Sequence, residues 1–287
     1  MDMEKLRVAI QKSGRLSEKS LELLKESGIY LNNGSRKLRS LAQMFPLEVI
    51  YLRDDDIPQY VEDGVAHIGI VGENEYAEKQ CDVELVERLG FSRCRLSLAI
   101  PKSEEYRGTG DLEGKRIATS YPVILNRFLA EKGIRADVHV LSGSVELAPS
   151  IGIADAIFDI VSSGSTLISN GLKEVETVMH SEAVVISHKN LSAEISDLLD
   201  QLLFRIRSVQ AASSNRYILL NAPNERLKEI IEVIPGMKSP TVMPLAEEGW
   251  SSVHSVLSEK EFWGVIDRLR ELGAQGILVI PIEKMIV

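Results

Sequence analysis

Residues 143–171 read GSVELAPSIGIADAIFDIVSSGSTLISNG, and this stretch carries the clearest functional signal in the chain. Its apolar run from Ala156 to Val161 predicts a buried strand, which contains Asp159 and is preceded by Asp155. Carboxylates are rare in a buried strand unless they have partners or lie at its exposed end. The strand therefore points to a polar site at one of its ends.

A turn rich in hydroxyl groups and glycine follows this strand, and Leu167 and Ile168 then begin a predicted helix. The turn consists of Ser162, Ser163, Gly164, Ser165 and Thr166. A strand that ends in such a turn presents backbone N–H groups and the positive end of a helix dipole, which suits a phosphate. The nearby carboxylates can accept hydrogen bonds from ribose hydroxyls. Together they predict a site for a phosphorylated sugar, although a turn of this kind can also serve only as a helix cap.

The order of residues in this stretch also resembles a known signature. The patterns SGSVExAP, GxADxIxDxV and SGxTL, which start at Ser142, Gly152 and Ser163, are similar to those of ATP phosphoribosyltransferase, the first enzyme of histidine biosynthesis. The resemblance extends over the whole chain and is to the long form of the family. It implies a pentosyl-transferring glycosyltransferase in which N1 of ATP attacks C1 of 5-phosphoribosyl 1-pyrophosphate with Mg²⁺ assistance. The products are then 1-(5-phospho-β-D-ribosyl)-ATP and pyrophosphate.

The resemblance assigns roles to residues along the chain. Asp155 and Asp159 match the catalytic acidic positions, and Ser162 to Thr166 match the loop that binds phosphoribosyl pyrophosphate. The substrate is expected to carry the Mg²⁺, so no residue is a certain metal ligand. ATP itself is the nucleophile in the family, so no catalytic cysteine or histidine is required. The positions implied for ATP binding are Gln11, Lys12, Gly14, Arg15, Arg53, Gly72, Glu73 and Glu146.

The amino-terminal segment repeats the strand–turn–helix pattern. Residues 6–10 predict a strand, QKSGRL follows it, and Ser17 is expected to cap the next helix with Leu16 and Leu21 forming a hydrophobic staple. The basic glycine turn suits an anion, and a solvated loop is about as good an interpretation of the residues alone. The family has this motif beside its nucleotide site, which favours the functional interpretation.

Residues 63–74, DGVAHIGIVGEN, are similar to the second motif of the family. His67 stands where the family often has Asp, and we assign it no catalytic role. Asp55 and Asp56, just ahead of Pro58, are expected to cap a helix. The basic cluster at residues 35–39 is either a solvated surface or a contact for ATP phosphates.

The alternation of strands and helices predicts a parallel α/β architecture. With the resemblance, it indicates two lobes like those of periplasmic binding proteins. Lobe I comprises residues 1–93 and 183–210, and lobe II comprises residues 94–182. Small polar residues at 209–215 predict a linker. Residues 211–287 follow the order βαββαβ of a ferredoxin-like domain, with Asn224 expected to cap its first helix and Ser258 with Glu261 its second.

The third domain binds histidine as feedback inhibitor in the family, so the resemblance implies allosteric control by L-histidine at an interface between third domains. A homo-oligomer, from dimer to hexamer, is expected for the same reason. The segment from Gly236 to Thr241 is otherwise an ordinary turn between a helix and a strand. The matching positions are Asn221, Met237, Ser239, Thr241 and Ala274.

The composition limits the other partners. The net charge of −9 disfavours nucleic acid and anionic membranes. The start of the chain has no apolar signal region, and no run reaches membrane-spanning length. Cys81 and Cys94 form no metal-ligand pattern and are expected to be reduced thiols. These features predict a cytoplasmic protein.

Two other functions remain open from the residues. The chain could be a two-lobed binding protein for a small anion, or a phosphoribosyltransferase that acts on a different base. An assay with phosphoribosyl pyrophosphate, Mg²⁺ and a panel of ATP, free bases and anthranilate distinguishes the three.

Overall fold

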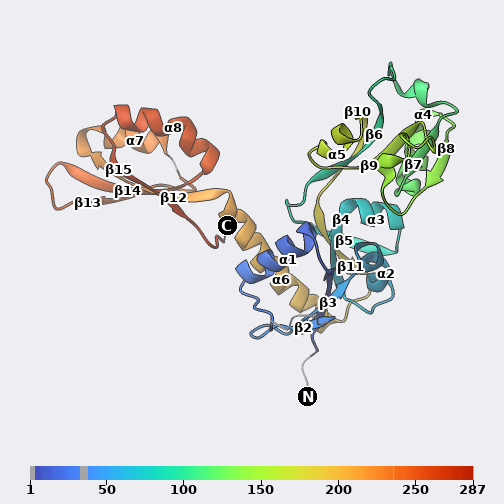
Figure 1. Ribbon diagram of the computed structural model, residues 1–287. Coiled ribbons are helices and arrows are strands. Elements are labelled where there is room, and N and C mark those ends of the chain that lie inside the picture. Colours follow the sequence, from blue (N-terminus) through green and yellow to red (C-terminus); the bar gives the residue numbers. More distant parts are fainter. Residues whose placement is uncertain (1–3, 33–37, 235, 287) are drawn as a thin grey trace. The chain divides into compact units, whose positions relative to one another are not determined.

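The computed structural model describes residues 4–32, 38–234 and 236–286 (Figure 1). The chain folds into two compact units. Unit 1 comprises Met1–Glu22 and Ile29–Leu199, and unit 2 comprises Leu23–Gly28 and Asp200–Val287. Each unit has its own hydrophobic core.

The first sheet of unit 1 has the strand order β2-β3-β1-β4-β11-β5. Strand β1 is parallel to both β3 and β4, whereas β11 is antiparallel to its neighbours β4 and β5. Helix α2 (Ile57–Glu62) packs on β1, β4 and β11, which buries Ile57 and Val61 against the sheet. The strands are β1 Leu6–Gln11, β2 Arg39–Leu41, β3 Leu47–Leu52, β4 Ile68–Gly72, β5 Val83–Arg88 and β11 Ala183–His188.

The second sheet of unit 1 has the strand order β10-β6-β9-β7-β8. Strand β7 is parallel to β8 and β9, and β6 is antiparallel to β9 and β10. Phe158 of β9 is fully buried in a core that helix α4 (Pro122–Lys132) covers with Ile124, Leu125 and Phe128. The strands are β6 Cys94–Pro101, β7 Arg116–Thr119, β8 Asp137–Val140, β9 Ala156–Val161 and β10 Leu172–Ser181.

The α/β fold is confirmed, but the expectation of parallel sheets is wrong in part. Each sheet is mixed. In the first sheet β11 is antiparallel to β4 and β5 and β2 is antiparallel to β3, and in the second sheet β6 is antiparallel to β9 and β10. The strands of the first sheet all lie within residues 1–93 and 183–210, and those of the second within 94–182. The assignment of these ranges as functional lobes stays a prediction.

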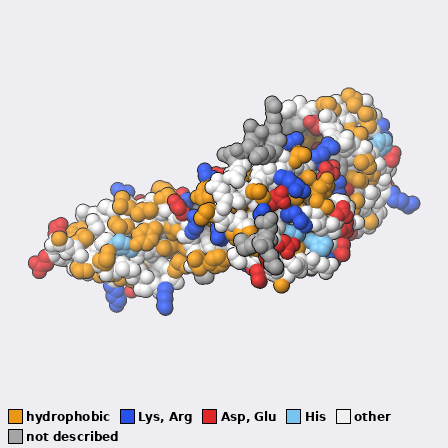
Figure 2. Space-filling view, turned by 90° about the horizontal axis from the view of Figure 1, so that it is seen from below, with side chains coloured by type: hydrophobic (Ala, Val, Ile, Leu, Met, Phe, Trp, Pro, Cys, Tyr) orange, Lys and Arg blue, Asp and Glu red, His pale blue; other side chains and the backbone are white. Residues whose placement is uncertain are grey.

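The sheet of unit 2 has the strand order β13-β14-β12-β15, with antiparallel neighbours throughout. Its elements follow the order βαββαβ, and this topology is ferredoxin-like. Helices α7 and α8 cover one face with Ile230, Phe262 and Leu269. Hydrophobic side chains also gather on the exposed surface of this unit, as Figure 2 shows. The elements are β12 Asn215–Pro223, α7 Leu227–Val233, β13 Thr241–Pro244, β14 Trp250–Ser258, α8 Glu259–Glu271 and β15 Gln275–Pro281.

The capping box of α8 is confirmed, since Ser258 accepts from the backbone N–H of Glu261 and the Glu261 side chain accepts from that of Ser258. Two other expected caps are wrong. Helix α1 (Arg15–Glu26) begins before Ser17, because Gly14 turns the chain with φ +99° and its carbonyl accepts from the N–H of Glu18. Asn224 opens a short 3₁₀ helix, and its side chain accepts from Ser251 Oγ.

The expected linker at residues 209–215 is also wrong. Helix α6 (Ala193–Ser213) continues through most of it, because Val209 and Ala212 are buried and the alanines favour a helix. Asp55 and Asp56 lie in a 3₁₀ turn, and Asp56, at the N-cap of α2, makes no side-chain cap hydrogen bond. Within the described residues, every helix is too short or too polar to span a membrane.

Candidate active site

The polar segments that the sequence singles out follow parallel strands. In the first sheet, Lys12 follows β1, Arg53 follows β3 and Glu73 follows β4. In the second sheet, Ser162 follows β9. Ligands of open α/β sheets bind at the carboxyl ends of their strands. In each sheet of unit 1, the side at which these strands have their carboxyl ends, called its edge below, is therefore suited to a ligand.

The loop after β9, residues 162–166, is an exposed turn rich in hydroxyl groups. Gly164 has φ +79°, a left-handed conformation that favours glycine, and it is the N-cap of the short helix α5 (Ser165–Ser169). The hydroxyls of Ser163 and Ser165 lie 2.9 Å apart. The side chains of Ser162, Ser163, Ser165 and Thr166 are all exposed. Arg95 contacts the loop, since its Nη1 donates to the carbonyl of Ser162 at 3.2 Å. The loop can therefore offer hydroxyls and backbone N–H groups to an oxyanion.

Asp159 lies near the carboxyl end of β9, close to this loop. Burial raises the pKa of its carboxyl to about 6, the N–H of Ile160 opposes this rise, and the charge of Glu146 adds to it. Glu146 itself is half-buried in a 3₁₀ turn at Val145–Leu147. A carboxylate in this setting binds a cation or hydroxyl donors readily, because they relieve its burial.

Asp155 lies at the other end of β9. The strand has six residues, so about 20 Å separates Asp155 from the loop. Asp155 pairs with Arg116 at 2.7 Å and accepts from the backbone N–H of Arg116 at 2.9 Å. The hydrogen bonds from Arg116 lower the pKa of Asp155 to about 2. The structure therefore does not bring Asp155 to the loop, contrary to the joint role expected for the two acids.

The edge of the first sheet gathers cations. Lys12, Arg15 and Arg53 are exposed, and within the described ranges no carboxylate forms an ion pair with any of them. The side chain of Gln11 lies over Gly14, where an added Cβ would be 3.7 Å from Gln11 Oε1. Gly72 has less room, since a Cβ there would lie 2.3 Å from Asn74 Oδ1. Small residues thus keep this edge open beside unpaired positive charge.

A cluster of acids that was not predicted from the sequence lies between the carboxyl ends of the strands of the two sheets. Burial and the charge of Glu75 raise the pKa of Asp54 to about 7, and Asp54 Oδ1 is buried without a hydrogen-bond partner. Burial also raises the pKa of Glu75. Burial and the charges of Glu75, Asp159 and Asp54 raise the pKa of Tyr121, which follows β7. Asn74 Nδ2 contacts both Glu75 Oε1 and Tyr121 Oη at 3.2 Å.

The acid triplet at 54–56 and the Glu-Asn-Glu run at 73–75, each after a predicted strand, are the only signals in the sequence for this cluster. No residue pattern indicates that they meet Tyr121, because the three segments are distant in the chain. Within the described residues, no group of three or more His, Cys, Asp or Glu side chains could hold a metal ion.

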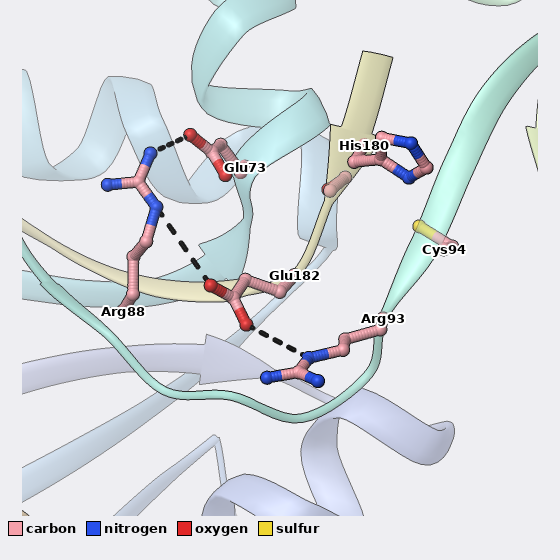
Figure 3. A pocket seen from close by; sticks show the side chains of 7 residues that line it. Glu73, Arg88, Arg93, Cys94, His180 and Glu182 are labelled. Atoms are coloured by element: carbon pink, nitrogen blue, oxygen red, sulfur yellow. Dashed lines mark hydrogen bonds and ion pairs between the residues drawn. The ribbon is translucent and has the colours of Figure 1, made fainter. Parts of the chain in front are cut away.

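Glu73 turns toward a different pocket, of about 390 Å³, where the chain crosses between the two sheets (Figure 3). There it pairs with Arg88, and Glu182 contacts Arg93 at 3.4 Å. Cys94 and Ser181 lie on the two crossing strands. Ser181 Oγ donates to Asn74 Oδ1 at 2.8 Å, which ties this crossing to the acid cluster.

The residues expected to bind histidine lie in two places on unit 2. Met237, Ser239 and Thr241 are exposed before and at the start of the edge strand β13. Asn221 of β12 packs against Gly276, next to the buried Ala274. One sheet carries both groups, but β14 separates β13 from β12.

The basic cluster expected at residues 35–39 falls mostly outside the described residues. Its last member, Arg39, lies in β2 and contacts Glu48 at 3.5 Å.

Comparisons with known proteins give a consistent result. The family described as ATP phosphoribosyltransferase matches residues 53–208, and that described as HisG, C-terminal domain, matches residues 212–284. The ATP phosphoribosyltransferase of Parabacteroides distasonis is 62% identical over 98% of this chain and 100% of its own length. That of Phocaeicola vulgatus is 62% identical over 98% of this chain and 99% of its own.

Solved structures give the same picture. A chain of the ATP phosphoribosyl transferase (HisG:HisZ) complex from Thermotoga maritima has a TM-score of 0.59 at 30% identity, over 70% of this chain and 98% of its own. A histidine kinase sensor domain with similarity to periplasmic binding proteins has a TM-score of 0.51 at 12% identity, over 74% of this chain and 92% of its own. The second likeness concerns the fold alone.

Proposed function

Because this chain belongs to the ATP phosphoribosyltransferase family, we propose that the two edges of unit 1 divide the substrates of that reaction between them. The enzyme transfers the 5-phosphoribosyl group from phosphoribosyl pyrophosphate to ATP, the first step of L-histidine biosynthesis. A bond forms between N1 of ATP and C1 of the ribose while the bond from C1 to the pyrophosphate oxygen breaks. Neither the enzyme nor a cofactor has to supply a nucleophile.

The loop Ser162 to Thr166 binds the 5-phosphate of the sugar in this proposal. Gly164 leaves room for the phosphate to approach the backbone, and the hydroxyls of Ser163 and Thr166 donate to its oxygens. The observation that carries the proposal is the position of Asp159 on the strand that ends in this loop. A ribose whose phosphate lies in the loop has its hydroxyls within reach of that carboxylate.

ATP binds at the edge of the first sheet. Lys12, Arg15 and Arg53 face its polyanionic triphosphate without competing carboxylates among the described residues. Gln11 and Gly14 shape the turn, and Gly72 gives close access beside Asn74. Glu73 is turned toward Arg88, so its contribution to ATP binding is the weakest of the set.

The buried Glu75 and the half-buried Asp54 and Asp159 hold positive charge between the two substrates. Asp54 and Asp159 would position a magnesium ion carried by the pyrophosphate, for which one or two carboxylates suffice, and such an ion would neutralise the leaving group. Asp159, whose pKa is about 6, and Asp54, with a pKa of about 7, both gain from a neighbouring cation. The acids also favour the positive charge that develops at C1 as pyrophosphate departs.

Unit 2 binds L-histidine and lowers the activity of unit 1 in this proposal, as the family resemblance implies. The exposed turn with Met237, Ser239 and Thr241 offers hydroxyls and backbone groups, and Asn221 offers an amide. Because β14 separates these two groups, we propose that histidine binds between unit 2 copies of a homo-oligomer. Histidine and the substrates must then weaken each other reciprocally.

The direct test uses purified protein with phosphoribosyl pyrophosphate, Mg²⁺ and one acceptor at a time. We expect ATP to give a product heavier by one phosphoribosyl group, which mass spectrometry detects. One pyrophosphate should be released per product, as measured by a phosphate assay after pyrophosphatase treatment. Free bases and anthranilate should give neither. Pyrophosphate release with another acceptor, and none with ATP, would refute the assignment.

A further inference from the structure

A second polar pocket lies on the first sheet, at the ends of the strands opposite to those of the proposed ATP site. Its volume is about 310 Å³, room for about ten water molecules. The pocket lies at the amino ends of β1 and β4, beside Arg7 and His67. The carboxyl ends of the same strands, at Gln11 and Gly72, belong to the proposed ATP site. The lining residues are Glu4, Arg7, Gly64, His67, His188, Asn190, Leu191, Ser192 and Ile195.

Arg7 is a half-buried cation without an acidic partner. Its Nη2 donates to the carbonyl of Gly64 at 2.9 Å, the one hydrogen bond that its side chain makes with the described residues. Its Nε is buried and has no hydrogen-bond partner. No described carboxylate forms an ion pair with Arg7, although Glu4 also lines the pocket. Most of the five guanidinium N–H donors are therefore left for a ligand or solvent.

Two histidines add N–H donors. His67 Nδ1 accepts from the backbone N–H of Arg7 at 3.0 Å, so its proton is on Nε2. Burial and the neighbouring charges of Arg7 and His188 lower the pKa of His67 to about 4, against the opposite effect of Glu4, so the ring is neutral. His188 Nδ1 accepts from the N–H of Asn190 at 3.0 Å, which likewise leaves an Nε2–H donor.

The first turn of helix α6 closes the pocket. Ser192 caps this helix of 21 residues, since its Oγ accepts from the N–H of Ile195 at 3.3 Å. The positive end of the helix dipole thus faces the same space as Arg7. Glu4 is exposed, and its carboxylate accepts from Ser192 Oγ at 3.4 Å. The remaining polar lining consists of donors, apart from the amide oxygen of Asn190 and backbone carbonyls.

We propose that this pocket binds a small oxyanion, a phosphate or a carboxylate, between Arg7, His67 and His188. The ligand supplies the acceptors that the guanidinium and the two Nε2–H groups lack. Charge-assisted hydrogen bonds from a guanidinium to such an oxyanion are among the strongest in proteins. The site is separate from the loop at Gly164, because it lies on the first sheet, at the strand ends away from the proposed ATP site.

The test follows the histidine rings of the full-length protein by NMR, with carbon-13 in those rings. The chain has five histidines, so each can be assigned by single substitution. Inorganic phosphate is titrated at constant ionic strength, and acetate is titrated separately. We expect saturable shifts of the His67 and His188 signals, while His139 and His254 stay unchanged. Response to both anions indicates a general oxyanion site, and response to one alone identifies which class the pocket prefers.

Arg7→Met should weaken this binding by about tenfold or more, because it removes the charged donor. Arg135→Met, at an exposed arginine of the second sheet's lobe, is the matched control and should leave the titration unchanged. If Arg7→Met does not fold, as judged by circular dichroism, His188→Phe provides the same test. No saturable shift with either anion, equal shifts in all five rings, or full binding in the variants would overturn the proposal. Phosphate in the loop at Gly164 is distinguished by His180, which is opposite Arg95, the residue that holds the carbonyl of Ser162. A shift of His180 without shifts of His67 and His188 reports that loop and counts against the pocket.

Discussion

The carboxylate of Glu78 accepts a hydrogen bond from the backbone N–H of Ile124 at 3.0 Å, and a second from the N–H of Val123 at 2.9 Å. Glu78 lies on α3 (Glu73–Lys79), which follows the first sheet, and Ile124 lies in the first turn of α4, which belongs to the second. Helix α4 opens with Pro122, so these two N–H groups are unpaired within the helix itself. A buried acid of one sheet layer thus caps a helix of the other.

Glu78→Ala should lower the stability of unit 1, because it leaves two backbone donors without their partner. We expect a loss of about 1–3 kcal/mol in the free energy of unfolding by urea. Glu131→Ala, on an exposed position of the same helix α4, is the control and should cost much less. Equal losses in the two variants would mean that the cap does not hold the layers together.

Asp54→Asn should stabilise the protein at alkaline pH. The pKa of Asp54 is about 7 in the fold against an ordinary value of 3.8, so the folded state binds the proton more tightly. Between these pH values the wild type loses stability as pH rises, by up to about 1.4 kcal/mol per pH unit. The amide cannot ionise, so the variant should be more stable at pH 8 and equal at pH 4 by urea unfolding.

The exposed acid Asp267 provides the comparison for that experiment, since Asp267→Asn should show no such dependence on pH. A stability of Asp54→Asn below that of the wild type at pH 8 would contradict the raised pKa of Asp54. A carboxyl group with a pKa raised in this way is typical of sites of binding or catalysis.

Asp159→Asn should lower turnover by about a hundredfold, because the amide offers no negative charge to the ribose or to a cation. The wild-type rate should also fall as pH drops through about 6, where Asp159 takes up a proton.

Asp155→Asn should leave turnover nearly unchanged and instead remove the pairing with Arg116. That pairing stabilises the fold above pH 4 and is lost as pH falls toward 2, with a contribution of about 1 kcal/mol in this partly exposed position. If Asp155→Asn loses turnover while its unfolding is unchanged, Asp155 acts on the substrate after all.

Replacing Ser239 and Thr241 with alanine should relieve inhibition by L-histidine without changing the uninhibited rate. Both hydroxyls are exposed, so the fold of unit 2 does not depend on them. Initial rates across a histidine titration measure the change, which we expect to be about tenfold in the half-inhibiting concentration. Wild-type activity that is insensitive to millimolar histidine would contradict the regulatory role of unit 2.

The local patterns of the sequence predicted the fold well. Strand β9, its glycine turn and the start of α5 are contiguous, so alternation and turn chemistry suffice to identify them. The box at Ser258 and Glu261 is likewise local. The sequence could not reveal that Arg116 holds Asp155, because the partner lies 39 residues away. The cluster of Asp54, Glu75 and Tyr121 was missed for the same reason, and the antiparallel return of β11 depends on a crossing between sheets.

The affinity of Gly164→Ala for phosphoribosyl pyrophosphate tests the central claim most directly. Gly164 has φ +79°, and a Cβ there meets only the side chain of Val161 within 4 Å, so the change adds bulk on the open side of the loop. Gly171→Ala is the matched control, since Gly171 has φ +71° and no neighbour within 4 Å, with the same backbone cost. We predict that calorimetry finds phosphoribosyl pyrophosphate binding weakened about tenfold or more in Gly164→Ala alone, with ATP binding unchanged in both variants. Unchanged phosphoribosyl pyrophosphate affinity in Gly164→Ala would contradict the account, because the loop after β9 would then not hold the sugar phosphate.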